Sequence, residues 1–138
     1  MSYKNIVLAL CGRGDEGKVI KEAFNLKDQL NADLSIVHVN DPHAGEMSMM
    51  MDSPKIITED DIKERLVVNG FEKEADSILI RIVEGENVAK AIEEAASGAN
   101  MLILGHRKRS AFKDQFFDSV DEGIVNRVEC PVVVVPKD

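Results

Sequence analysis

Two glycine-containing turns carry the residue types that could bind a phosphorylated ligand. In the first, Gly12, Gly14 and Gly17 fall within six positions, directly after the apolar run at residues 6–10. Glycines let a backbone approach phosphate closely, but this spacing is not the dinucleotide-binding fingerprint and lacks the Lys-Ser or Lys-Thr pair of a P-loop. We therefore favour a tight strand-to-helix turn over a phosphate-binding turn.

The second turn begins at Gly105, after the apolar residues 101–104. A basic cluster follows in a chain whose formal net charge is −8: Arg107, Lys108, Arg109 and Lys113. Side-chain cations bind phosphate where backbone amides cannot, so this loop is a candidate phosphate contact. A solvated surface loop is the alternative interpretation of the same cluster.

Catalytic and metal-binding patterns have little support in the sequence. His106 follows Gly105 and could act as an acid or base, but we favour a solvated loop residue. His38 lies inside an apolar run and is expected to be a packed structural residue rather than a ligand. No Ser-His-acid order and no His-Cys cluster with zinc spacing stands out, so we predict neither catalytic residues nor a metal site.

Residues 41–57 form the least regular segment, with prolines at both ends and a methionine-rich run between Met47 and Met51. Methionines beside His43 would suit a soft metal. Methionine also packs adaptably on binding surfaces. We favour a mobile flap over the sheet, or a dimer contact, over metal binding.

Short apolar runs alternate with amphipathic segments along the whole chain. The runs that predict strands are residues 6–10, 34–39, 77–83, 101–104 and 132–135, and predicted helices begin near residues 15, 58, 88 and 119. Thr58 and Asp61 fit a capping box at the start of the second helix. This alternation predicts one α/β domain, residues 1–138, with an open five-stranded parallel sheet and helices on both faces.

Composition narrows the class of protein. At 138 residues and 44% apolar content, the chain is expected to form a single globular domain. No apolar run reaches the roughly 18 residues that a membrane span needs, and the N-terminus does not resemble a signal peptide, so a cytoplasmic location is expected. Cys11 and Cys130 are expected to be reduced and buried. The acidic balance and absence of tryptophan argue against a nucleic-acid binder.

The C-terminal part of the chain resembles the universal stress protein family. In that family the last-but-one strand ends in Gly, two residues and a second Gly follow, and nine residues later come Gly and Ser or Thr. A helix and a Cys-Pro-apolar strand complete the pattern. Gly105 matches the first glycine, Ser119 the hydroxyl residue, and Cys130 with Pro131 the last strand, whereas Lys108 and Asp118 replace the other two glycines.

The resemblance implies the strand order 3-2-1-4-5, with a ligand cleft where the first and fourth strands diverge. It places Cys11 where nucleotide-binding members carry an Asp that faces the nucleoside, and Val39 near the adenine. The implied cleft residues are Cys11, Gly12, Val39, Gly105, Arg107, Lys108, Ser119 and Val120.

Departures from the family pattern argue against tight ATP binding. A thiol at Cys11 cannot replace a carboxylate as an acceptor, and side chains at Lys108 and Asp118 remove the clearance that glycine gave. Asp118, Asp121 and Glu122 put acids at the helix start, where phosphate would dock. We therefore predict no tightly bound ATP and no required cofactor, with ATP or another adenine nucleotide as the alternative.

The last strand is predicted to mediate assembly. In the implied order it is an edge strand, and its apolar positions are Val132, Val133, Val134 and Val135. An exposed apolar edge invites pairing with another chain, and family members commonly dimerise through this strand. We predict a homodimer with a two-fold axis through this strand. The protein would then act in a stress response through an unknown protein partner, without contacting nucleic acid or membrane.

Overall fold

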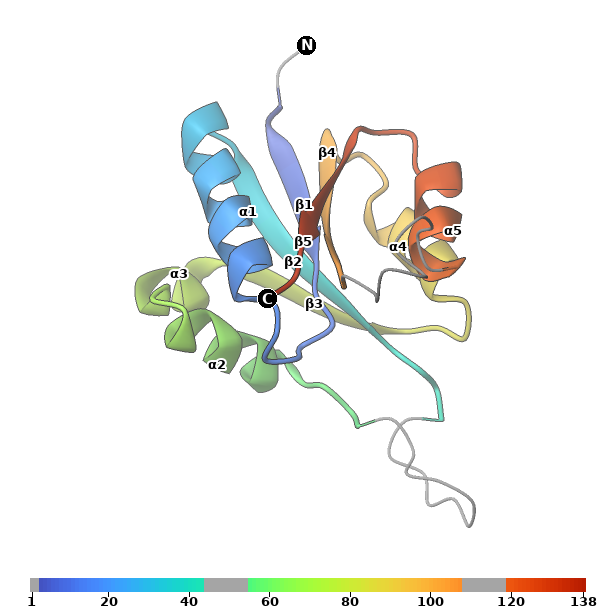
Figure 1. Ribbon diagram of the computed structural model, residues 1–138, viewed down its shortest axis with the longest axis horizontal. Helices are drawn as coiled ribbons and strands as arrows, with labels where there is room; N and C mark the ends of the chain where they lie inside the picture. Colours follow the sequence, from blue (N-terminus) through green and yellow to red (C-terminus); the bar gives the residue numbers. More distant parts are fainter. Residues whose placement is uncertain (1–2, 44–54, 108–118) are drawn as a thin grey trace.

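The computed structural model describes residues 3–43, 55–107 and 119–138. In chain order, its elements are β1 (Asn5–Ala9), α1 (Gly17–Leu30), β2 (Asp33–Asn40), α2 (Glu59–Val68), α3 (Glu72–Ser77), β3 (Leu79–Glu84), α4 (Val88–Ala95), β4 (Met101–His106), α5 (Ser119–Arg127) and β5 (Val132–Pro136). All strand pairs are parallel, in the order β3-β2-β1-β4-β5 (Figure 1). The predicted fold class and strand order are confirmed.

The alternation of side chains along the strands builds two cores. Ile6 and Leu8 of β1 face one side of the sheet and pack with residues of α1, α2 and α3. Val7, between them, faces the other side and packs with α4 and α5. Figure 1 shows these two helix groups on opposite faces of the sheet. Both faces are thus covered, which explains why the strands read as continuous apolar runs.

Local signals in the sequence set the start and the end of α2. At the start of α2, the Asp61 N–H donates to the Thr58 hydroxyl (3.2 Å) and the Thr58 N–H donates to the Asp61 carboxylate (2.9 Å), which confirms the predicted capping box. The helix ends before Gly70, whose φ of +92° is a left-handed conformation that glycine adopts without strain. The residue before Thr58, Ile57, is hydrogen-bonded to Asn40 at the end of β2.

The six-residue helix α3 was not predicted. We expected a strand over residues 77–83, whereas α3 occupies Glu72–Ser77 and β3 begins at Leu79. One residue of α3 is buried, Ala75. A single buried alanine produces no 3.6-residue apolar stripe, so the sequence gives no periodic signal for this helix.

The C-terminal residues fold back against the start of α1. The Lys137 N–H donates to the His106 carbonyl (2.9 Å), and the Asp138 N–H donates to the Asp15 carbonyl (3.0 Å). The Asp138 carboxylate accepts the Lys18 N–H (3.2 Å) in the first turn of α1. Figure 1 shows the C-terminus at this end of the helix. This fold-back brings the Lys137 side chain to the ends of β1 and β4.

Strand β5 lies at one edge of the sheet, as predicted, and Val132, Val133, Val134 and Val135 are all half-buried.

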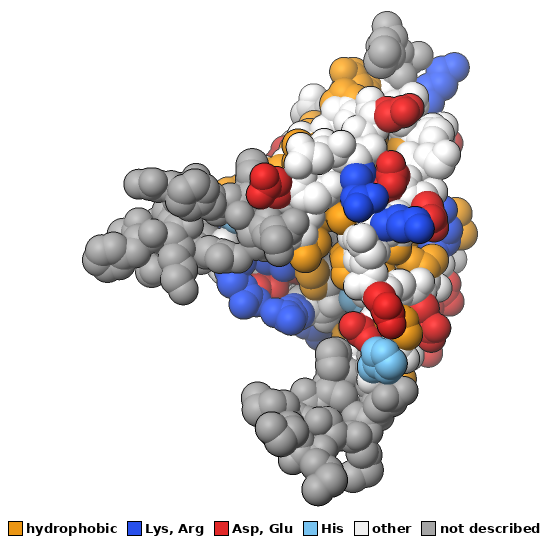
Figure 2. Space-filling model, turned by 90° about the vertical axis from the view of Figure 1, so that its right-hand side faces the viewer, with side chains coloured by type: hydrophobic (Ala, Val, Ile, Leu, Met, Phe, Trp, Pro, Cys, Tyr) orange, Lys and Arg blue, Asp and Glu red, His pale blue; other side chains and the backbone are white. Residues whose placement is uncertain are grey.

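Figure 2 views the face with α4 and α5, where acidic and basic side chains are mixed and a group of Lys and Arg side chains lies next to hydrophobic ones. In the three described ranges, no helix combines the length and the apolar character that crossing a membrane requires. Most of the methionine-rich segment, residues 44–54, lies outside the described residues.

Candidate functional site

A cleft of about 980 Å³ opens at the carboxyl ends of β1 and β4, where the order of strands reverses. Its volume lies at the upper end of the range for small-molecule sites, and its place in the sheet is where α/β proteins bind ligands. The predicted site residues that line it are Cys11, Gly12, Val39, Gly105, Arg107 and Val120. Lys108 lies outside the described residues, and Ser119 is the first residue of α5, with its side chain not described.

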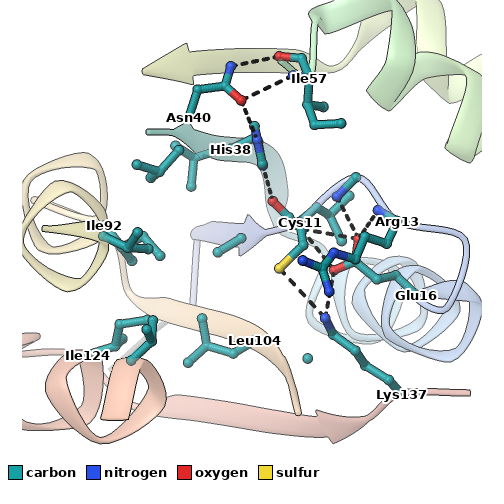
Figure 3. A pocket seen from close by; sticks show the side chains of 18 of the residues that line it. Cys11, Arg13, Glu16, His38, Asn40, Ile57, Ile92, Leu104, Ile124 and Lys137 are labelled. Carbon is teal, nitrogen blue, oxygen red and sulfur yellow. Dashed lines mark hydrogen bonds and ion pairs between the residues drawn. The ribbon is translucent and has the colours of Figure 1, made fainter. Parts of the chain in front are cut away.

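One end of the cleft, the polar end, consists of Cys11, Gly12, Arg13, Glu16 and Lys137 (Figure 3). The Glu16 carboxylate is 1% exposed and accepts three backbone N–H groups of the turn after β1. The donor–acceptor distances are 2.9 Å from Cys11, 2.8 Å from Gly12 and 3.3 Å from Arg13. Backbone N–H groups gathered in this way form an anion site, and here an internal carboxylate already occupies it.

Glu16 is the N-cap residue of α1, at the start of the helix, but its side chain makes no cap hydrogen bond. The helix begins at Gly17, its first turn contains no acidic residue, and the Glu16 side chain turns back to the preceding loop. Gly12 has a φ of +80°, so the turn adopts a left-handed conformation at that residue. The Glu16 carboxylate therefore stabilises a tight strand-to-helix turn.

Lys137 completes the polar end. Its side chain is 8% exposed, and its Nζ lies 3.7 Å from the Glu16 Oε2 and 3.6 Å from the Cys11 Sγ. A Cβ added at Gly105 would lie 2.9 Å from the Lys137 Cε and 2.8 Å from the Val19 Cγ2. Gly105 therefore provides clearance for a side chain of the protein itself, which lets Lys137 reach the carboxylate.

Both cysteines are free thiols, but neither is buried as expected: Cys11 is exposed and Cys130 is half-buried. Although Cys11 meets solvent in the cleft, desolvation by the surrounding protein raises the pKa of its thiol, and the Glu16 carboxylate raises it further. Lys137 and Arg13 act in the opposite direction on the same pKa. Desolvation also raises the pKa of Cys130. Cys11 therefore carries less thiolate at neutral pH than an ordinary cysteine does.

Of the basic cluster after Gly105, the structure describes Arg107 alone. The Arg107 guanidinium donates to the Asp15 carboxylate at 3.1 Å, at the edge of the cleft. Lys108, Arg109 and Lys113 lie outside the described residues. His106 is the half-buried last residue of β4, not the solvated loop residue that we expected.

The opposite end of the cleft, the apolar end, consists of Val39, Val88, Ile92, Leu104 and Ile124. Figure 3 shows Ile92 of α4 and Ile124 of α5 side by side, across the cleft from Cys11 and Glu16. Both isoleucines are buried, at 6% and 2% exposure. These side chains belong to one hydrophobic cluster and form an apolar wall of the cleft.

Strand pairing also leaves backbone groups of Val39 directed into the cleft. The Leu10 N–H donates to the Val37 carbonyl (3.0 Å), so the backbone groups of Val37 face β1. Groups two residues apart on a strand point to the same side, and therefore the N–H and carbonyl of Val39 also point toward β1. Strand β1 ends at Ala9, before this position. The apolar end thus offers one donor and one acceptor to a ligand.

His38 is buried, at 8% exposure, as a packed strand residue should be, yet it also lines the cleft. Its Nδ1 lies 2.7 Å from the Leu10 carbonyl oxygen and its Nε2 lies 2.9 Å from the Asn40 Oδ1. Asn40 in turn bonds the backbone of Ile57. Four residues of the cleft were not predicted from the sequence: Glu16, Lys137, Asn40 and Ile57. An acid within a glycine-rich turn is the one signal that could have pointed to Glu16.

Metal binding finds no support in the described part of the chain, where no group of three or more His, Cys, Asp or Glu residues is arranged to hold an ion. The described cations of the cleft are Arg13, Lys55, Arg107 and Lys137, and its acids are Glu16 and Asp41.

Comparisons with known proteins agree on the fold. The sequence profile of the Universal stress protein family matches residues 2–136. A solved universal stress protein in complex with cAMP is 22% identical over the full length of both chains, with a TM-score of 0.68. Another, from Archaeoglobus fulgidus, is 21% identical over 98% of this chain and 95% of its own, with a TM-score of 0.64. A universal stress protein from Archaeoglobus fulgidus in complex with dAMP is 18% identical over 98% of this chain and 99% of its own, with a TM-score of 0.56. No match is found among curated protein sequences.

Proposed function

The chain belongs to the universal stress protein family, and from this premise we propose that it is a member whose cleft holds no ATP tightly and which acts as a homodimer through protein contacts. The observation that carries the first part is the Glu16 carboxylate, which takes up three backbone donors at the polar end. A polyphosphate that approached these donors would have to displace Glu16 or share them with it.

Either outcome is costly for a triphosphate. Glu16 is 1% exposed, so a displaced carboxylate would lose charge-assisted hydrogen bonds and leave three backbone donors to be satisfied again. A carboxylate that stayed in place would repel the phosphates at close range. Glu122, in the first turn of α5, adds a negative charge at the helix start, where the helix dipole would otherwise favour phosphate.

Calorimetry with ATP tests this part of the proposal. We expect no measurable heat of specific binding below millimolar ATP, and micromolar affinity would overturn the proposal. The rescue variant combines Cys11→Asp, Lys108→Gly and Asp118→Gly with Glu16→Gln, and we expect it to bind ATP more tightly. The same triple change with Glu16 retained is the matched control. If the fourfold variant gains no affinity, the cleft is not the nucleotide site of this chain.

An adenine mononucleotide is the second candidate ligand, because the apolar end remains open. Its apolar wall suits a planar base, and the Val39 N–H and carbonyl offer the complementary donor and acceptor to a base edge. Solved family members in complex with cAMP and dAMP, both monophosphates, favour the same class of ligand. Small molecules released from the purified protein by denaturation, and identified by mass spectrometry, would test it. An adenine monophosphate supports this candidate; ATP in stoichiometric amount contradicts the main proposal.

The proposed dimer rests on the free edge of β5. The Leu102 N–H donates to the Pro131 carbonyl and the Lys137 N–H donates to the His106 carbonyl, so the odd-numbered residues of β5 direct their backbone groups toward β4. Those of Val132 and Val134 then point away from the sheet and can pair with a second copy.

Sedimentation tests the dimer. We expect the unmodified protein to be a dimer at tens of micromolar, and Val134→Pro to be a folded monomer, because proline removes an outward N–H without breaking the β4–β5 bonds. Lysine at Val133 or Val134 should also weaken the dimer. A monomeric unmodified protein would overturn the proposal, and so would a dimer that persists with lysine at both positions.

A further inference from the structure

The orientation of the Asn40 amide is fixed by the backbone of Ile57. The Ile57 N–H donates to the Asn40 Oδ1 (3.1 Å), and the Asn40 Nδ2 donates to the Ile57 carbonyl (2.8 Å). A backbone N–H can only donate and a carbonyl can only accept, so the oxygen and nitrogen of this side chain cannot be exchanged. The Asn40 oxygen therefore faces His38.

His38 consequently has an oxygen acceptor at each ring nitrogen. The Leu10 carbonyl oxygen lies 2.7 Å from Nδ1, and the Asn40 Oδ1 lies 2.9 Å from Nε2. A neutral imidazole has one N–H, so one of its nitrogens would direct a lone pair at an oxygen within hydrogen-bonding distance. The imidazolium has two N–H donors and satisfies both acceptors.

The same three residues hold a short strap across the cleft. The strap, residues 55–58, leads into α2, and its Ile57 side chain lies against the turn after β1: a Cβ on Gly12 would be 2.7 Å from the Ile57 Cγ2. Ile57 is tied to the end of β2 by its two bonds to Asn40 (Figure 3). The strap thus bridges the end of β2 and the turn after β1, and His38, Asn40 and Ile57 all line the cleft.

We propose that His38, Asn40 and Ile57 form a proton-dependent clasp on the cleft. With both ring nitrogens protonated, His38 donates to Leu10 and to Asn40, and the clasp holds the strap closed. Loss of one proton turns one of these bonds into a repulsive contact between lone pairs. The Asn40 amide then loosens its hold on Ile57, and the strap opens the cleft at higher pH.

The other charged and titratable groups around the cleft come from five segments. They are Cys11, Arg13 and Glu16 after β1, Asp41 after β2, Lys55 in the strap, Arg107 after β4 and Lys137 after β5. Glu16, Lys137 and Arg107 have partners of their own, as described above. The oxygens of Leu10 and Asn40 are the groups within hydrogen-bonding distance of the His38 ring nitrogens in the described chain. These two oxygens therefore determine how many N–H donors the His38 ring needs.

Nuclear magnetic resonance on the full chain tests the clasp between pH 5 and pH 9. Ring ¹⁵N shifts report the protonation state of His38, and hydrogen exchange reports the protection of the Ile57 amide. We expect that protection to fall roughly tenfold as His38 loses its proton, the loss expected for one hydrogen bond to a charged group. The Leu10 amide, bonded to the Val37 carbonyl, should keep its protection and serves as the control.

Two variants separate the clasp from simple packing. Asn40→Asp keeps the acceptor for His38 and adds a negative charge, so the midpoint of the ring ¹⁵N transition should move to higher pH. Its carboxylate cannot donate to the Ile57 carbonyl, so this variant is followed by the ring shifts and not by the Ile57 amide. His38→Gln should remove the transition, whereas His43→Gln, at an exposed position, should leave it unchanged. A neutral His38 ring across the whole range, with Ile57 still protected, would overturn the proposal. An Ile57 amide that keeps its protection in the unmodified protein while the ring titrates would also overturn it. Where His38→Gln does not fold, the ring midpoint of Asn40→Asp tests the contact between His38 and residue 40.

Discussion

The polar and apolar ends of the cleft both lie at the carboxyl ends of the strands. They differ in whether their groups already have partners within the protein. At the polar end, the backbone donors after β1, the Glu16 carboxylate and the Lys137 ammonium are partners of one another. At the apolar end, Val39 and Val88 remain half-buried at the wall of the cleft. The polar end thus resembles a filled site, and the apolar end an open one.

The difference between the two ends shows that a turn rich in backbone N–H donors need not bind a ligand. Strand ends leave backbone N–H groups that need acceptors, and a ligand is one way to supply them. Here the chain supplies the acceptor itself, through Glu16, and neutralises it with Lys137. The glycine-rich turn is therefore evidence for a structural requirement, and the open apolar wall is the better evidence for a ligand.

The largest expected effect comes from emptying the polar end. Glu16→Ala leaves three backbone donors and the Lys137 ammonium without their carboxylate. Removing one partner of such a buried pair costs about 3–5 kcal/mol. We expect the free energy of unfolding, measured in urea, to fall by that amount.

Glu22→Ala is the matched control, because Glu22 lies exposed on α1, and its effect should stay within about 0.5 kcal/mol. If Glu16→Ala cost no more than this control, the turn would not depend on its internal carboxylate. The backbone donors of the polar end would then not need an acceptor from the chain itself.

A smaller effect is expected at Val88, at the apolar end. Val88 is half-buried at the wall of the cleft, so Val88→Ala removes apolar surface that is only partly shielded from water. We expect a loss of about 1 kcal/mol in urea. Ile124→Ala, at a residue of the same wall that is 2% exposed, should cost about 2–5 kcal/mol. If the two variants lost equal free energy of unfolding, Val88 would be as fully shielded from water as Ile124, and the apolar end would not be open.

The sequence predicted the fold because the fold depends on repeated signals. Five apolar runs and the capping box at Thr58 appear directly in the residue order, and the strands and α2 lie close to them. Helix α3 was missed because one buried alanine gives no periodicity. The family resemblance brought Cys11, Val39 and Gly105 to one cleft, where the structure also places them.

The internal partners in the cleft could not be predicted in the same way. Cys11 and Lys137 are 126 positions apart, and no local pattern connects them. Their contact depends on the fold-back after β5 and on the clearance at Gly105. Cys11 was expected to be buried because it follows an apolar strand, but the residue just past a strand end faces the cleft rather than the core.

The smallest expected effect is on the reactivity of the Cys11 thiol, where electrostatics and packing predict opposite results for a change at Lys137. Desolvation and Glu16 raise the pKa of this thiol, and Lys137 lowers it. In a Cys130→Ser background at pH 8, iodoacetamide should therefore alkylate Cys11 several-fold more slowly in the folded than in the unfolded protein. Glu16→Gln should speed the reaction and Lys137→Met should slow it, because one removes a negative charge and the other a positive charge near the sulfur. Both variants loosen the same cluster, so greater access alone would speed both. Opposite signs, measured by mass spectrometry of the alkylated protein, would show that Glu16 and Lys137 act on Cys11 through their charges, whereas faster reaction in both variants would contradict that view of the polar end.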